Sequence, residues 1–376
     1  MANHPREQTQ DKRTDAKFLR AVIIRAFILL VVLAAIILAI DPTRALGKVS
    51  LYNRLFPGRE RFPYGENPQR SYNMTVNDLD VMFASHAVAQ DKSDDEFRVL
   101  VFGDSSVWGT LLGNDETLTG QLNQRGIKTC DGKKVVFYNL GYPTISLQKD
   151  VLMLNRALAY QPDLILWPLT LEAFSGMNPA TSPLLDINRE EVNRLFPPAK
   201  NEDQEKMSFL DRVQAQRRGL ADWFRYQIYG VLWAATGIDQ DLSQSWEPAQ
   251  RDFEPDSTFN GRDQFDLAAE LDFTPLSTGI DLAGNTPVWL VNEPILVSRG
   301  ENNQLRYNFF YPRWAYDAFR EAMQAKAESE GWTYFDLWDV IPEGEFTNSA
   351  IHLTAAGEKL LSYRIAEKMQ TTLGCQ

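Results

Sequence analysis

The stretch VLVFGDSSVWG, from Val99 to Gly109, carries the first residues whose types and spacing could do chemistry. An apolar run that is typical of a buried strand ends in Gly103 and Asp104, and two serines follow. A serine at the end of a strand can present its hydroxyl, and its backbone N–H can face a negative charge that develops on a substrate oxygen. We therefore predict that Ser105 is a nucleophile.

A serine hydroxyl is a weak nucleophile at neutral pH and needs a base. The chain has three histidines, His4, His86 and His352. The first two precede the predicted strands, so we do not expect them near Ser105. His352 lies in FTNSAIHLTAAG, between the last predicted strand and the last predicted helix. We predict that His352 is the base; the alternative is an ordinary structural histidine.

Short apolar segments alternate with helical patterns over the second part of the chain. Strands are predicted at Phe97–Phe102, Lys134–Leu140, Leu164–Leu169, Pro287–Glu293 and Thr333–Leu337, and helices at Glu116–Arg125, Lys149–Tyr160, Trp314–Glu330 and Ala355–Met369. This alternation predicts an α/β fold, with a doubly wound parallel sheet covered by helices on both faces. Such sheets bind ligands at the carboxyl ends of their strands, where both Ser105 and His352 are expected.

An insertion, at about residues 176–285, separates the third and fourth predicted strands. It contains a helical pattern from about Ser208 to Ala235 that is rich in aromatic and aliphatic residues. The simplest interpretation is a cap helix packed on the domain. The alternative is a surface that docks on a membrane or on a membrane-embedded partner.

Ala21–Ile40 reads AVIIRAFILLVVLAAIILAI, and its length matches the ~20 apolar residues that a membrane-spanning helix requires. Basic residues precede this segment and Asp41 follows it. By the positive-inside rule, the N-terminus is cytoplasmic and the rest of the chain is extracytoplasmic. We predict a retained anchor in a single-pass membrane protein; the alternative is a signal peptide cleaved near ALG at Ala45–Gly47.

These features divide the chain into four parts. Residues 1–20 are predicted to form a cytoplasmic tail, residues 21–40 a transmembrane helix, residues 41–95 a membrane-proximal stalk, and residues 96–376 the α/β domain with its insertion.

The composition excludes several classes of function. A net charge of −12 argues against a nucleic acid as the main partner, because phosphate contacts need clustered Lys and Arg. One usable histidine leaves no imidazole cluster for a metal, and no cofactor is predicted. The two cysteines, Cys130 and Cys375, are predicted to form a disulfide in an oxidising exterior; the alternative is two unpaired thiols.

Three blocks resemble a known family. GDSS at Gly103–Ser106, NLGYPT at Asn139–Thr144 and the late IHLTAAG are similar, in this order, to the first, second and last blocks of the SGNH (GDSL-like) hydrolase superfamily. The resemblance covers roughly Phe97–Met369, apart from the insertion. It implies a flavodoxin-like, three-layer α/β/α domain over residues 96–376.

The resemblance also implies roles for individual residues. Ser105 is the expected nucleophile and His352 the expected base. The backbone N–H groups of Ser105 and Gly141 are expected in the oxyanion hole, the set of donors that binds the negative oxygen of the reaction intermediate. Asp104 is expected to brace the turn that carries the nucleophile.

The third block departs from the family pattern. The family supplies an Asn whose amide completes the oxyanion hole, whereas the corresponding stretch here is PLTLEAF, which places Glu172 near the Asn position. A carboxylate there would repel an oxyanion, so Thr170 is the candidate for the third donor; the alternative is a site that rests on the two backbone N–H groups.

The last block departs from the pattern as well. The family places an Asp three residues before the His to orient the imidazole, and here that residue is Ser349, with Asn348 one position further back. Both are candidates for orienting His352. Asp336 and Asp339, near the end of the fifth predicted strand, are candidates that would reach the ring through space.

A narrower set of relatives shares these departures. The architecture resembles membrane-anchored SGNH-like proteins that act with membrane-bound O-acyltransferases, as in alginate acetylation and D-alanine transfer to cell-wall polymers. This implies a serine esterase or O-acyltransferase that acts on acyl esters of cell-surface glycans, with an O-acyltransferase as partner. The alternative is a non-catalytic SGNH-fold subunit that binds or assembles a polysaccharide acylation complex.

Overall fold

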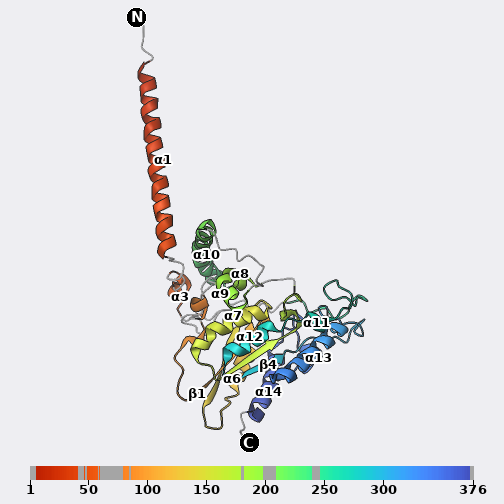
Figure 1. The fold of residues 1–376 in the computed structure, drawn as a ribbon. Helices are drawn as coiled ribbons and strands as arrows, with labels where there is room; N and C mark the ends of the chain where they lie inside the picture. The colour runs from red at the N-terminus through yellow and green to blue at the C-terminus, as the bar shows by residue number, and fades with distance from the viewer. Residues whose placement is uncertain are drawn as a thin grey trace.

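The computed structural model of the protein describes residues 6–40, 46, 49–57, 59, 79–83, 86–178, 182–197, 209–238 and 246–372. His4 and Cys375 lie outside the described residues. Figure 1 shows one long helix, α1 (Arg6–Ile40), which projects from an α/β body that holds the rest of the described chain.

A parallel sheet organises the α/β body. Its strands are β1 (Glu96–Gly103), β2 (Lys134–Gly141), β3 (Leu164–Leu169), β4 (Val288–Asn292) and β5 (Thr333–Asp336). They pair in the order β2-β1-β3-β4-β5, and every pair is parallel. This is the strand order of the flavodoxin-like doubly wound fold, whose ligand crevice lies where the order reverses, beside β1 and β3. The predicted α/β fold is therefore confirmed.

Helices cover both faces of the sheet and bury its strands. On one face lie α7 (Leu147–Ala157), α12 (Thr274–Ala283) and α13 (Arg313–Glu330), and on the other lie α6 (Leu118–Gln124) and α14 (Ala355–Thr372). Within β1, Leu100 and Phe102 join the first layer while Val99 and Val101 join the second. Two covered faces explain why the strands read as continuous apolar runs.

The sequence patterns did not predict α12, which lies inside the proposed insertion. It packs on α7, and a Cβ at Gly279 would lie only 2.6 Å from the Trp167 ring. Glycine is needed for this close approach, although glycine and the nearby Pro275 both weaken a helical pattern. A tertiary contact therefore overrides the local preference.

Shorter elements complete the body. They are α3 (Leu51–Leu55), α4 (Leu79–Phe83), η1 (Ala87–Ala89), α5 (Ser105–Trp108), η2 (Leu158–Tyr160), η3 (Leu171–Ala173), α8 (Pro183–Ile187), α9 (Arg189–Leu195), α11 (Leu267–Glu270) and η4 (Glu343–Glu345). The insertion also contains one long helix, α10 (Phe209–Thr236), which matches the predicted helix there. In Figure 1, α8, α9 and α10 lie on the side of the body toward α1.

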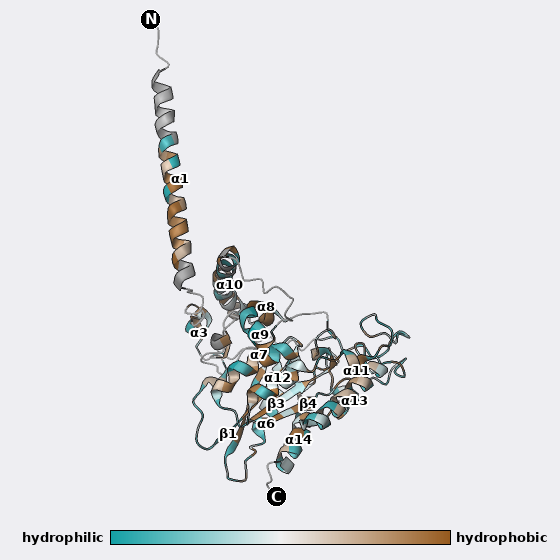
Figure 2. Cartoon of the chain, in the orientation of Figure 1, coloured by the Kyte–Doolittle hydropathy of each residue, from teal (hydrophilic) through white to brown (hydrophobic). Residues whose placement is uncertain are grey.

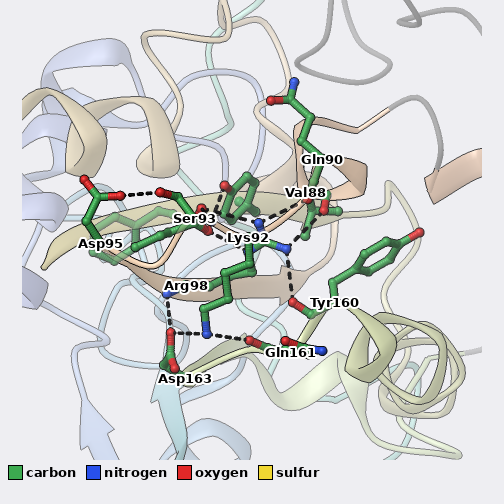
Figure 3. A network of polar contacts seen from close by, with 12 residues as sticks. Val88, Gln90, Lys92, Ser93, Asp95, Arg98, Tyr160, Gln161 and Asp163 are labelled. Carbon is green, nitrogen blue, oxygen red and sulfur yellow. Dashed lines mark hydrogen bonds and ion pairs between the residues drawn. The ribbon is translucent and has the colours of Figure 1, made fainter.

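A buried arginine fixes the segment that precedes β1 (Figure 3). The guanidinium of Arg98 donates to the carbonyl oxygens of Val88 (3.3 Å), Gln90 (3.2 Å) and Tyr160 (3.0 Å), and it pairs with Glu96 at 2.6 Å. The described end of the predicted stalk is therefore held against the amino end of β1. This end of the sheet is opposite to the edge where Ser105 lies.

The apolar part of α1 is exposed to the surroundings. Over Lys17–Ile36, α1 is long and apolar enough to cross a membrane, and none of this stretch is buried against the rest of the protein. Figure 2 shows the apolar stretch as a brown section of the helix. It overlaps the predicted span at residues 21–40. By length and composition, a helix of this kind serves as an anchor or as a signal sequence.

Candidate active site

The turn after β1 exposes one backbone donor beside Ser105. Asp104 caps α5, because its Oδ1 accepts from the Ser106 N–H at 2.8 Å. The Ser105 N–H is the first of the helix and has no intrahelical acceptor. Gly103 precedes them with a φ of 151°, and a Cβ there would lie 2.5 Å from Val107 Cγ2. The turn therefore requires glycine and leaves the Ser105 N–H open to a substrate oxygen.

Ser105 and His352 meet at this turn although they are 247 residues apart in the chain. His352 Nε2 lies 2.8 Å from Ser105 Oγ, and His352 Nδ1 lies 3.0 Å from Asn348 Oδ1. An amide oxygen only accepts hydrogen bonds, so Nδ1 carries the ring proton and Nε2 is free to accept the proton of the hydroxyl. This is the geometry of a nucleophile, its general base and an orienting group.

The electrostatics of the site favour a neutral imidazole. Burial lowers the pKa of His352 below its usual value of 6.5, and the negative charge of Asp104 opposes part of that effect. His352 is therefore unprotonated at neutral pH and can act as a base.

The loop that carries His352 closes on itself and on the segment that follows β4. Thr347 N donates to His352 O at 2.8 Å, and Leu296 N donates to Ala350 O at 2.7 Å. This closure brings residue 348 under the ring. Ser349, one position closer in sequence, instead accepts from the Ile351 N–H at 3.4 Å.

The two aspartates proposed as orienting groups lie elsewhere. Asp336 accepts from Arg320 Nε at 2.9 Å and from Asn292 Nδ2 at 2.8 Å, and Asp339 is exposed. Among the described residues, neither carboxylate hydrogen-bonds the ring of His352. Of the four orienting candidates, the structure brings only Asn348 to the ring.

Two of the proposed oxyanion donors are already paired. The Gly141 N–H donates to Asn139 Oδ1 at 3.0 Å, and Thr170 Oγ1 lies 3.1 Å from the hydroxyl of Tyr311. Gly141 also allows α5 to pass close to β2, since a Cβ there would lie 2.4 Å from Trp108 N. The Ser105 N–H is thus the donor that the turn leaves open.

Glu172 is a buried carboxyl at the same edge of the sheet. It lies in η3, just after β3, and it makes no hydrogen bond or ion pair with any other described residue. Burial, together with a smaller effect of the charge of Asp104, raises the pKa of Glu172 to about 7. Glu172 is therefore a neutral acid below about pH 7 and an anion above it.

The sequence analysis did not identify a buried lysine that hydrogen-bonds the backbone behind the nucleophile turn. Lys149 in α7 is fully buried; its Nζ donates to Gly103 O at 2.7 Å and to Tyr142 O at 3.3 Å, and it pairs with Asp150 at 2.5 Å. It therefore joins the ends of β1 and β2 behind the nucleophile. The available signal was a Lys-Asp pair on the apolar face of a predicted helix.

Two buried glutamates, also missed, lie beneath the turn. The Ser106 hydroxyl donates to Glu293, which follows β4 directly. Glu293 Oε1 and Glu358 Oε2 have no hydrogen-bond partner among the described residues. Both line a small cavity with about 20 Å³ for the centres of water-sized molecules, enough for one water.

These glutamates bring little charge to the site. Burial raises the pKa of Glu358 to about 8 and the pKa of Glu293 well above its usual value. Glu358 is therefore neutral at pH 7, and burial favours the neutral form of Glu293 as well.

The arrangement is suited to acyl transfer. Ser105 Oγ can attack a carbonyl carbon, His352 can take and return a proton, and the Ser105 N–H can stabilise the resulting oxyanion. Among the described residues, no group of three or more His, Cys, Asp or Glu side chains is placed to hold a metal ion.

Comparison with known proteins gives similarity only at the level of solved structures. No family model and no curated protein matches the chain. An aryl esterase from M. smegmatis is 15% identical over 73% of this chain and 98% of its own, with a TM-score of 0.38. A carbohydrate acetylesterase from Sinorhizobium meliloti is 15% identical over 73% of this chain and 99% of its own, with a TM-score of 0.36.

A member of the lipolytic G-D-S-L family from Veillonella parvula is 12% identical over 72% of this chain and 96% of its own, with a TM-score of 0.35. These identities and scores are too low to assign an activity.

Proposed function

We propose that the protein is a serine esterase or O-acyltransferase of the SGNH (GDSL-like) type, anchored in a membrane by residues 21–40. The observation that carries the proposal is the chain of hydrogen bonds from Ser105 through His352 to Asn348, with distances of 2.8 Å and 3.0 Å. A serine and a histidine from opposite ends of the domain meet in the geometry that nucleophilic catalysis requires.

The reaction proceeds in two steps. Ser105 Oγ bonds to the acyl carbon of the ester while its proton passes to His352 Nε2, and the electron pair of the carbonyl moves onto its oxygen, beside the Ser105 N–H. When that oxygen re-forms the carbonyl, the alkoxide leaves with the proton from His352. Water or a glycan hydroxyl then attacks the acyl-enzyme by the same route, and Ser105 regains its proton.

The oxyanion hole bears on the choice between hydrolysis and transfer. With the Gly141 N–H paired internally and Thr170 Oγ1 in contact with the Tyr311 hydroxyl, the Ser105 N–H is the proposed donor that no described residue occupies. Loss of one oxyanion donor typically costs ~10²–10³ in rate. A weak hole suits an enzyme that receives activated acyl groups from a partner better than it suits a free hydrolase. The partner we propose is a membrane-bound O-acyltransferase, and the proposed acceptors are cell-surface glycans.

The location of the domain is inferred from the basic residues that precede the apolar segment of α1. Arg6, Lys12, Arg13, Lys17 and Arg20 precede the apolar segment, which supports a cytoplasmic N-terminus and an extracytoplasmic domain. Glycan acyl esters of the cell envelope would then be on the same side of the membrane as Ser105.

The same observations support one second candidate. The paired Gly141 N–H and the carboxyl of Glu172 at the family's Asn position are also compatible with a subunit that keeps the fold without catalysis. Such a subunit would bind acylated glycan within an acylation complex.

Hydrolysis of an aryl acetate by the purified full chain tests the proposal. We expect turnover that His352→Ala reduces by ~10³ or more, because the base and its proton relay are lost. His86→Asn is the matched control, since His86 lies in the segment before β1, and it should keep wild-type turnover. Wild-type turnover equal to that of His352→Ala, together with binding of an acetylated oligosaccharide, would support the non-catalytic subunit instead.

An acylated donor and a glycan oligosaccharide acceptor separate the two enzymatic outcomes. Transfer is expected to exceed hydrolysis when the O-acyltransferase is present in the same membrane. Release of free acid alone would leave a plain surface esterase.

A further inference from the structure

Exposed apolar side chains gather on one side of the α/β body. Outside α1, all but three of the large hydrophobic residues that are exposed in the described chain belong to residues 49–55, to α8 or to residues 210–238. The three exceptions are Phe310, Leu360 and Tyr363. Single exposed hydrophobic residues are normal on a protein surface, but a concentration of them indicates an interaction site.

Helix α10 carries the centre of this surface, and two of its faces are apolar in the C-terminal half. One face packs on α3: Leu51 N donates to Gln227 Oε1 at 2.7 Å, and Ala234 shares a small core with Tyr52.

The other face carries Phe224, Ile228 and Leu232, which are 63%, 44% and 52% exposed. Their four-residue spacing places them in one stripe along the helix. A cap helix that faced water would be polar on this side.

The stripe is continuous with the proposed anchor. Helix α3 begins at Leu51, shortly after α1 ends at Ile40, and α10 contacts both α1 and α3. Figures 1 and 2 show α10 beside the lower end of α1, on the side of the body from which α1 projects. If α1 crosses a bilayer, this part of α10 lies at the level of the bilayer surface.

The composition of α10 fits lipid. Trp223, Tyr226, Tyr229 and Trp233 are of the residue types that are enriched at membrane–water interfaces. Arg217 and Arg218 are exposed on a chain whose net charge is −12, and they can pair with anionic lipid headgroups. Helices that lie in the plane of the interface combine such an apolar stripe with basic residues.

We propose that α10 is a second membrane contact, in which the stripe of Phe224, Ile228 and Leu232 enters the leaflet next to the C-terminal end of α1. The inference rests on the proposed anchoring by α1. With two contacts, the α/β body is held in a fixed orientation on the membrane surface. The catalytic edge of the sheet is then held at a fixed distance from that surface.

A photo-crosslinking experiment tests the contact. Ile228 is replaced by a benzophenone amino acid, and the full chain is reconstituted in vesicles of phosphatidylethanolamine and phosphatidylglycerol. After irradiation, the mass of the intact protein is measured by mass spectrometry. We expect a covalent phospholipid adduct. The control carries the same amino acid at Leu360 in α14, which has a similar exposure of 40%, and it should form no lipid adduct.

The other occupants of the surface would give different products. A covalent dimer from the probe at residue 228, or a crosslink to another protein in native membranes without a lipid adduct, would overturn the proposal. Equal lipid adducts at residues 228 and 360 would overturn it as well.

A second variant removes the apolar stripe. In this experiment the photo-crosslinking amino acid replaces Ala221. In the wild-type background it should give a lipid adduct. The adduct should be lost in the triple variant Phe224→Glu, Ile228→Glu and Leu232→Glu. Its aryl acetate hydrolysis in detergent should be unchanged, because the stripe is outside the catalytic machinery. An unchanged lipid adduct would contradict the role of the stripe.

Extraction of native membranes with alkaline carbonate separates this inference from the anchor. A processed chain in the soluble fraction would contradict the anchor and the inference together. A membrane-bound full chain with no lipid adduct at residue 228 would contradict the inference alone.

Discussion

Asn348 is the residue whose substitution tests the catalytic geometry in most detail. Its Oδ1 lies 3.0 Å from His352 Nδ1 and fixes the tautomer, but as a neutral group it stabilises the imidazolium of the transition state only weakly. Asn348→Asp would place a carboxylate at the same position. Asn348→Ala would remove the hydrogen bond altogether.

The distance sets the size of the effect. Two unit charges 3.0 Å apart interact by about 1.4 kcal/mol in water and about 5.5 kcal/mol at an effective dielectric of ~20. Asn348 is exposed, so the lower figure applies. We therefore expect Asn348→Asp to raise the pKa of His352 by about one unit and kcat/KM on the plateau by about tenfold.

The pH profile of aryl acetate hydrolysis provides the assay. Because burial lowers the pKa of His352 below 6.5, the acidic limb of the wild-type profile should lie below that value. In Asn348→Asp the acidic limb should move up by about one pH unit, and Asn348→Ala should lose about tenfold or more at all pH values. An unmoved limb in Asn348→Asp together with wild-type rates in Asn348→Ala would refute the orienting role of Asn348.

Four further predictions concern the buried groups and the cysteines. Ionisation of Glu172 near pH 7 places a negative charge at the catalytic edge, so wild-type hydrolysis should fall above that pH. The hydrolysis rate of Glu172→Gln should not fall there. At alkaline pH, Glu172→Asn should hydrolyse the ester ~10-fold faster than wild type. The pKa of Glu172 is higher in the folded chain than the usual 4.5, so its contribution to the free energy of unfolding is present below pH 4.5 and is lost as the pH rises through about 7. In urea unfolding, Glu172→Gln should lack that loss. Parallel pH dependences of wild type and Glu172→Gln would contradict a raised pKa of Glu172. Lys149→Met should cost about 3–5 kcal/mol in urea unfolding, because it leaves Asp150 buried without its cationic partner. The control Lys92→Met, at a partly exposed pair with Asp163, should cost less than about 1 kcal/mol, and equal costs would show that Lys149 does not brace the site. Cys130 is disulfide-bonded in the structure, and non-reduced peptide mapping should recover it linked to Cys375, whereas two alkylatable thiols in the secreted part would exclude the bridge.

Local patterns were sufficient to predict the sheet. All five strands lie within one or two residues of their predicted ranges, because strands covered on both faces must be apolar throughout. Helix α12 was not predicted, because Gly279 serves its contact with Trp167 and at the same time weakens the helical pattern.

The site was predictable only in part, for a physical reason. Ser105 and His352 follow strands at one edge of the sheet, so their order along the chain implies that they meet. The choice of Asn348 among four candidates depends on how the loop closes, which spacing does not encode. Lys149 and Glu293 are of charged residue types that are usually exposed, so the sequence pattern does not predict that they are buried. Their burial depends on partners that only the folded structure brings together.

Labelling by a fluorophosphonate probe shows whether Ser105 is a nucleophile. The full chain and the variants Ser105→Ala and Ser106→Ala are treated with the probe, digested and mapped by mass spectrometry. We expect one adduct, on Ser105, which is lost in Ser105→Ala and retained in Ser106→Ala. The Ser106 hydroxyl is buried against Glu293, so it should remain unlabelled in the full chain. Equal labelling of wild type and Ser105→Ala, or no labelling of a folded wild type, would contradict a nucleophilic Ser105.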